Sequence, residues 1–458
     1  TIALNHLDVD VDLALEGEKV LVSHCELNSD VAQLKMAGTL FLGTTSPGNS
    51  MFGQQDYHAE GSIDCARLAG QLPGVLRIRE DAEVTSGQVE FVLDSTVKEN
   101  QRIWKGNVGA SQITAVSAGR PIRWERPLSI QFEAAETSDG QITSHLQFES
   151  DYLKIAMDGS AAEFTVTANG DLTRLANDLR PLVDLQELDL AGRFNTQLVA
   201  SRKPAGEFEA HASVLLEQFE LATPGHGKLH HDRLTLKLEA TGVLDKDRLS
   251  KLNSGMMKVK SAGDQFTVSL REPVAPAVDA MWPLEIVASG KLQTWQAQLE
   301  RWLPKFSWQC EGPFNLIANA SWGPSEVTLS DSLLQVTSCR VTTAEGRVVE
   351  QPTVQISSAG KWDRKTGQFT SARTSVKSAA AVLAGENIAM QFNSKAEEGL
   401  PALSGDFVVA GDVATIVEWL APAGFRPKYQ MRGKLNGRVQ LDSQGTATSA
   451  SCDFVVQD

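Results

Sequence analysis

The chain has 458 residues, of which 42% are hydrophobic and 22% are charged, and its formal net charge is −15. Lysine and arginine are scattered rather than clustered, and without a basic patch we expect no nucleic-acid partner. The five cysteines lie far apart and form no CxxC or Cys/His spacing, so we expect neither a metal site nor a disulfide framework. Because no run of about 18 apolar residues exists, any membrane anchor is expected to lie outside this segment.

The first part of the chain matches a later stretch. SHCELNSDVAQLKMAG at 23–38 resembles SHLQFESDYLKIAMDG at 144–159, at an offset of 121 (144 minus 23). We interpret residues 1–60 as the end of a repeat whose start is missing, and the chain as a fragment of a longer protein.

Four further segments each open with a glycine, at Gly61, Gly170, Gly290 and Gly411. A second glycine follows 22 residues later in three of them (170 to 192, 290 to 312, 411 to 433) and 26 residues later in the first (61 to 87). A fixed spacing inside a long period indicates one repeated supersecondary unit. We therefore predict repeats at 61–169, 170–289 and 290–410, and the start of another at 411–458, in one elongated array.

An apolar stripe at helical spacing follows the opening glycine in three repeats. Asp171 and Asp412 stand where a side-chain oxygen can cap the first free amides of a helix. Pro181, Pro304 and Pro422 are expected to end these helices after about three turns, because proline lacks the amide hydrogen. The stripes consist of Leu172, Leu175 and Leu179, of Leu292, Trp295 and Leu299, and of Val413, Ile416 and Leu420.

Apolar and polar residues then alternate over about fourteen residues, as is typical of an antiparallel strand with one apolar and one polar face. The stretch 306–322 shows the pattern, with Phe314 and Leu316 on one face and Asn315 and Asn319 on the other. The second glycine of each repeat falls on the apolar face. Glycine inside a strand often marks a bulge or bend, so we expect a curved sheet.

These patterns predict a mainly β fold, in which each repeat of the long antiparallel sheet carries one short amphipathic helix. One short helix cannot shield a continuous apolar face. Our first interpretation is that the face lines an open hydrophobic groove, which would hold elongated apolar ligands. The alternative is that a second sheet covers it, as in a β-sandwich array or a β-solenoid.

Catalysis finds no support in the sequence. GxSxG, the Walker loop, HExxH and a GxGxxG after a strand are all absent, so we predict a non-enzymatic protein without a cofactor. His226, His230 and His231 could bring two imidazoles together across a turn. We expect no acidic or cysteine partner to be fixed beside this turn, and no other repeat has these histidines, so we predict no metal site.

The helix, the proline and the alternating strand of the type LAGRFNTQLVA together resemble the AsmA/TamB-like superfamily, best at 170–201 and 290–322. The resemblance implies a periplasmic protein of the bacterial cell envelope. An anchor outside this segment would hold it in the inner membrane, and its hydrophobic groove would carry phospholipid toward the outer membrane and a possible partner protein there.

Carried onto this chain, the resemblance implies that apolar strand faces contact the acyl chains of phospholipids. The residues are Val89, Phe91, Leu93, Phe194, Leu198, Phe314, Leu316, Leu435 and Val439. The alternative function is a structural or adhesive β-repeat protein of the cell envelope with no lipid cargo, in which these residues form ordinary sheet core.

Overall fold

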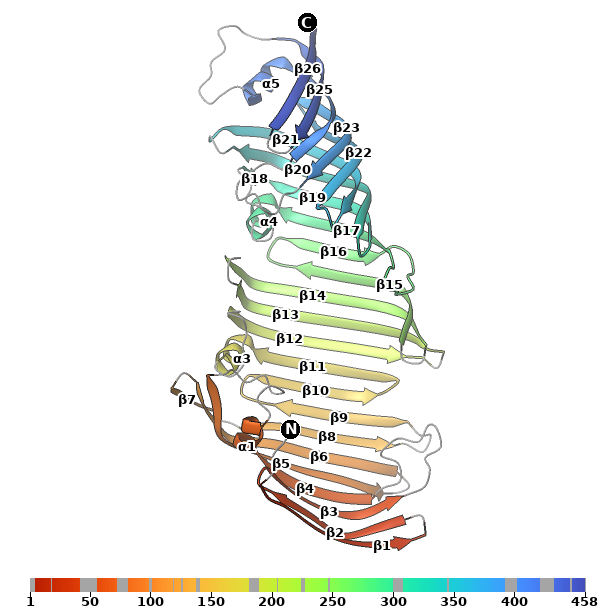
Figure 1. Ribbon diagram of the computed structural model, residues 1–458. Coiled ribbons are helices and arrows are strands. Elements are labelled where there is room, and N and C mark those ends of the chain that lie inside the picture. The colour runs from red at the N-terminus through yellow and green to blue at the C-terminus, as the bar shows by residue number, and fades with distance from the viewer. Residues whose placement is uncertain are drawn as a thin grey trace. The chain divides into compact units, whose positions relative to one another are not determined.

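A computed structural model gives the fold of the chain (Figure 1). It describes residues 5–17, 19–41, 56–71, 81–98, 101–117, 119–124, 127–136, 141–180, 189–203, 205–223, 227–245, 248–299, 308–343, 346–391, 402–420, 432–444 and 447–457.

The protein is mainly β, with 79% of the residues that the structure describes in strands. The 26 strands of the described residues belong to one long, open antiparallel sheet, which is not closed into a barrel and carries four short helices. The predicted fold class is therefore confirmed. The β-sandwich and β-solenoid alternatives are wrong, because the described strands all belong to one open sheet in which neighbouring strands pair antiparallel.

By their internal contacts, the residues divide into two units. Unit 1 comprises Thr1–Ala205 with Ala210–Arg233, and unit 2 comprises Gly206–Glu209 with Leu234–Asp458. β13 (Glu207–Thr223) and β14 (Gly227–Asp245) contribute residues to both. The predicted repeat boundaries stay a prediction.

In unit 1, strands next to each other in the chain pair antiparallel from β1 to β6, and again from β8 to β12. β8 pairs with β6, and the short β7 pairs antiparallel with the last residues of β6. The strands are β1 (Leu7–Glu16), β2 (Lys19–Ser29), β3 (Ala32–Phe41), β4 (Asp56–Asp64), β5 (Ala82–Lys98), β6 (Gln101–Ser117), β7 (Arg120–Arg123), β8 (Leu128–Glu136), β9 (Ile142–Glu149), β10 (Leu153–Ser160), β11 (Glu163–Asp171) and β12 (Asp189–Arg202).

Unit 2 continues in the same manner, and β18 and β19 both pair with β20. Its strands are the second part of β14, then β15 (Arg248–Lys260), β16 (Gln265–Leu270), β17 (Trp282–Lys291), β18 (Gln309–Glu311), β19 (Pro313–Trp322), β20 (Glu326–Thr342), β21 (Val348–Asp363), β22 (Gln368–Ser378), β23 (Ala381–Gln391), β24 (Ala402–Asp412), β25 (Lys434–Gln444) and β26 (Ala447–Gln457).

The four helices are α1 (Cys65–Gln71), α3 (Leu172–Leu179), α4 (Leu292–Leu299) and α5 (Val413–Leu420). The predicted caps are present: the backbone N–H of Arg174 donates to Asp171 (3.0 Å), and that of Thr415 donates to Asp412 (2.9 Å). α3, α4 and α5 have eight described residues each, and α4 and α5 border residues outside the described ranges, so the expectation of about three turns stays a prediction. The three prolines expected to end them lie outside the described residues.

The second glycine of each repeat marks an irregularity of the sheet, as predicted. Gly87, Gly192, Gly312 and Gly433 all have positive φ, between 115° and 143°. At Gly312 the expected single strand is broken into β18 and β19, because this backbone conformation interrupts regular pairing. Three non-glycine residues on neighbouring strands also have positive φ, and no sequence pattern marks them: Gln112, Gln218 and Ser338.

Replacing Gly192 with alanine is expected to destabilise unit 1. A Cβ there would lie 2.7 Å from the carbonyl oxygens of both Gln218 and Glu217, at a φ of +115° that side chains rarely adopt. We expect a loss of roughly 1–3 kcal/mol, measured by chemical unfolding. Gly109→Ala is the matched control, because the nearest atom to its Cβ would be 4.0 Å away. Equal effects of the two substitutions would contradict this account.

Candidate functional site

The apolar faces of the unit 1 strands are in register. Successive cross-strand pairs form one row with a single residue from each of eleven strands. All of them are buried or half-buried except Val11, which is exposed. Val11 lies in β1, and among the described strands β1 pairs only with β2. The row is Val11, Cys25, Met36, Ala59, Leu93, Gly106, Phe132, Leu146, Met157, Val166 and Leu198.

Unit 2 has an equivalent row across twelve strands. Its members are again buried or half-buried, except Phe454 in β26. Neither row contains a charged residue. The row is Leu236, Val259, Phe266, Ala288, Leu316, Leu334, Ile356, Val376, Leu383, Val409, Gly437 and Phe454.

The register places the nine predicted residues in two groups. Leu93, Leu198 and Leu316 lie in the rows, and Val439 lies one side-chain step from the unit 2 row, opposite Phe407. The others lie nearer the helices. Val89 pairs with Ile63, and the last four residues each pair with the opening glycine of a repeat: Phe91 with Gly61, Phe194 with Gly170, Phe314 with Gly290 and Leu435 with Gly411.

A helix covers the apolar face at this end of the strands. In unit 2, the indole of Trp295 from α4 packs edge-on against Phe314, with 5.4 Å between ring centroids, and lies 6.1 Å from Phe266. Phe314 is only 5% exposed as a result, in a cluster with Ala288 and Val336. This end therefore forms a small core, against which Leu316 packs from the next apolar position along β19.

The opposite face of unit 1 carries charges that alternate in sign from strand to strand. The ion pairs are His58 with Asp94 (2.7 Å), Lys105 with Glu133 (3.0 Å), and His145 with Asp158. Cross-strand register joins these six residues into one row over β4, β5, β6, β8, β9 and β10. Opposite charges on neighbouring strands favour this register, and charges keep this face in water.

Replacing Asp94 with asparagine is expected to lower the pKa of His58. The Asp94 carboxylate accepts a hydrogen bond from the imidazole and raises the pKa of His58 above its ordinary value of 6.5, although burial opposes the shift. The pair therefore stabilises the fold below that value, and its contribution is lost as the pH rises through the folded-state pKa. Imidazole proton shifts measured by NMR test this. An unchanged titration in the variant would show that Asp94 does not cause the shift.

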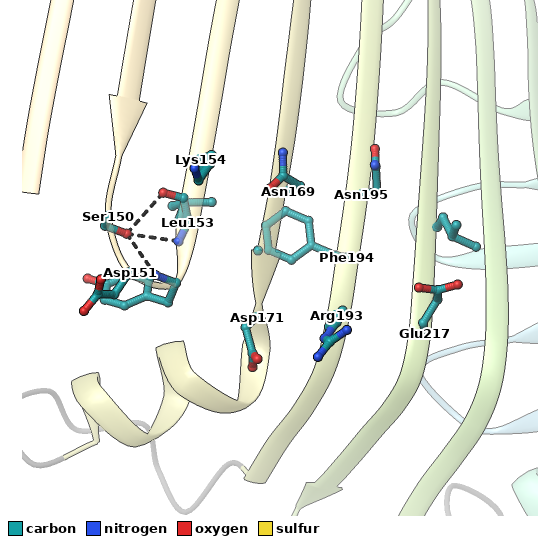
Figure 2. A pocket seen from close by; sticks show the side chains of 13 residues that line it. Ser150, Asp151, Leu153, Lys154, Asn169, Asp171, Arg193, Phe194, Asn195 and Glu217 are labelled. Atoms are coloured by element: carbon teal, nitrogen blue, oxygen red, sulfur yellow. Dashed lines mark hydrogen bonds between the residues drawn. The ribbon is translucent and has the colours of Figure 1, made fainter. Parts of the chain in front are cut away.

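A pocket of about 310 Å³ lies beside α3, and Figure 2 shows its lining side chains, which include the predicted site residue Phe194. Lys154, Asn169 and Asn195 come from three neighbouring strands. Asp151 pairs with Arg174 (3.4 Å), and Asp171 caps α3. The acidic groups at this end thus hold the helix to the sheet, which gives the pocket a structural role.

Of the three histidines singled out by the sequence, His230 has the acidic partners that the sequence analysis did not expect. His226 lies outside the described residues. The two ring nitrogens of His230 face Glu220 (3.1 Å) and Asp232 (3.2 Å). Within the described ranges, no group of three or more histidine, cysteine or acidic side chains is arranged to hold a metal ion.

No family model, no curated protein and no solved structure matches this chain. Among the described residues, no helix has the length and apolar character needed to cross a membrane. The fold and the two apolar rows therefore define a class, a single-layer antiparallel sheet with one apolar and one polar face, and the function must be argued from those faces.

Proposed function

We propose that the chain is a non-enzymatic lipid-binding protein, whose apolar sheet face holds the acyl chains of phospholipids. The observation that carries the proposal is the pair of uncharged, in-register rows on one face of a single open sheet. An apolar face in water is unfavourable, and each buried methylene of a bound acyl chain would contribute about 0.8 kcal/mol.

Each row crosses many strands, so it offers a long and narrow apolar surface that suits a long, unbranched apolar ligand. Alkyl chains offer no polar groups, so binding would follow buried area, and chains of different length or saturation would be held alike. A row without charge also lets a chain slide, because no position holds it more strongly than the next. These properties support movement of lipid along the sheet as well as storage.

The setting of the proposal comes from the resemblance to the AsmA/TamB-like superfamily. We place the protein in the periplasm, as a segment of a conduit that carries phospholipid between the inner and outer membranes. An anchor outside this segment would join it to the inner membrane, and a partner protein would receive lipid at the outer membrane. The alternating charges on the other face of unit 1 support an aqueous surrounding for that face.

Lipid extraction from the purified protein tests the proposal. The chain is expressed and purified without detergent, extracted with organic solvent, and analysed by mass spectrometry. We expect phospholipid in at least stoichiometric amounts. A stable, monodisperse protein free of lipid would overturn the proposal and favour a structural role in the cell envelope.

A further inference from the structure

The apolar face of unit 2 becomes aromatic at the end of the strands away from α4. Trp322 lies three side-chain steps from Leu316 along β19 and pairs directly with Trp282. Trp322 and Trp362 are 47% and 43% exposed, unusually high for indoles of an apolar face. Cross-strand pairs join seven strands here: Trp282, Trp322, Val327, Trp362, Phe369, Met390 and Leu403.

A cation lies on this aromatic row. The guanidinium carbon of Arg364 is 5.1 Å from the centroid of the Trp322 ring. Its Nη1 donates to the carbonyl oxygens of Gly323 (3.4 Å) and Pro324 (3.3 Å), which holds the side chain over the hairpin between β19 and β20. A guanidinium has five N–H donors in a planar fork, so donors remain after these two contacts.

No carboxylate among the described residues forms an ion pair with Arg364. Two nearby carboxylates contact other groups. Asp363, the residue before Arg364, accepts from the backbone N–H groups of Lys365 (2.8 Å) and Thr366 (3.0 Å). Glu326, which pairs with Asp363 across the sheet, forms an ion pair with Lys361 (2.5 Å). Where the apolar face ends, Arg364 thus presents a guanidinium whose contacts are with carbonyl oxygens and an indole ring rather than with a carboxylate.

We propose that Trp322, Trp362 and Arg364 form a headgroup site for anionic phospholipids. The inference rests on the proposed function and adds the lipid class. Indole rings favour the boundary between apolar and polar surroundings, where a lipid's glycerol region would lie. The guanidinium fork matches a phosphate in shape and charge, and the stacked ring holds it in place. A lipid whose acyl chains extend from Trp322 along the apolar face towards Leu316 would present its phosphate to Arg364.

Lipid competition tests the site. Lipid-depleted protein is incubated with vesicles containing equal amounts of phosphatidylglycerol and phosphatidylcholine with the same acyl chains, and is then re-isolated for mass spectrometry. Both lipids offer a phosphate to Arg364, but only phosphatidylcholine carries a quaternary ammonium that cancels its charge. We therefore expect phosphatidylglycerol to be enriched roughly fivefold, the fold-change that corresponds to the ~1 kcal/mol of an exposed ion pair. In Arg364→Gln, the bound lipids should approach the vesicle ratio while the total lipid per protein stays the same.

Arg373→Gln is the matched control, because it removes the same charge from an exposed position that pairs with Glu386 in the sheet. It should keep the enrichment. Loss of enrichment in this control, its persistence in Arg364→Gln, or wild-type protein that takes up both lipids equally would each overturn the headgroup site while leaving lipid binding intact. Enrichment abolished by equimolar inorganic phosphate would assign the site to free phosphate instead. Wild-type protein that takes up neither lipid would overturn the proposed function itself.

Discussion

Replacing Leu316 with arginine is expected to lower the amount of bound phospholipid at least tenfold while the sheet stays folded. Leu316 lies in the middle of the unit 2 row, between Ala288 and Leu334. A guanidinium there would have to lose water against an acyl chain without any carboxylate in the row to pair with, at a cost of several kcal/mol. A cost of about 1.4 kcal/mol lowers the binding constant tenfold. Even partial desolvation of the guanidinium is therefore enough to give the expected loss of bound lipid. Lipid extraction and mass spectrometry measure the loss.

The neighbouring residue provides the control. Ile317 is also apolar, is 51% exposed, and faces the other side of the sheet, where it pairs with Val287 and Leu333. Ile317→Arg adds the same charge one residue away and should leave the bound lipid unchanged. Far-UV circular dichroism would confirm that both variants fold. If both lose lipid equally, or neither does, the apolar face is not the binding surface.

Unit 1 allows an independent repetition. Leu198→Asp places a carboxylate in the apolar row, whereas Gln197→Asp places one on the exposed opposite face of the same strand. We expect the first variant to lose lipid and the second to keep it. Loss in only one of the two units would show that the lipid-binding face is confined to that unit.

Period-two alternation is sufficient to predict the strand faces, because a strand turns successive side chains to opposite sides. The alternation alone assigns Leu316 and Ile317 to opposite faces. The helical stripes are equally informative, since Val413 and Ile416 are both 7% exposed. Glycines with a special backbone role can be located from their spacing, as at Gly192 and Gly312, because other residues would be strained there.

Register cannot be predicted in the same way, because it depends on turn lengths and on bulges at positions such as Gln218 and Ser338, where glutamine and serine carry no signal of a positive φ. The sequence therefore does not show that Leu93 and Leu198 lie in one row, or that Phe194 pairs with an opening glycine. The pairing of Trp322 with Trp282, and the position of Arg364 over its ring, depend on the same register.

Replacing Trp295 with alanine is expected to detach α4 from the sheet. Its indole contacts Phe266 and Phe314 and packs on the buried cluster that includes Ala288 and Val336. Removal of a tryptophan from such a cluster costs about 3–5 kcal/mol when it is fully buried, and Trp295 is half-buried, so we expect roughly 2–4 kcal/mol. A helix of eight residues has little stability of its own, so this loss should release it.

Hydrogen exchange read by mass spectrometry resolves the effect, because the opening is expected to be local rather than global. Protection should fall in the peptides that cover α4 and Phe314, and remain in those that cover α3, which lies in unit 1. Trp308→Ala is the control, since Trp308 is 45% exposed and its removal should leave the exchange of α4 within error. Unchanged protection of α4 in Trp295→Ala would mean that the Gln296 side chain, which donates to the Trp308 carbonyl and accepts from the Cys310 N–H, holds the helix instead. A combined Trp295→Ala and Gln296→Ala variant would then be required to free it, and the exposed Phe314 would add to the apolar face available to lipid.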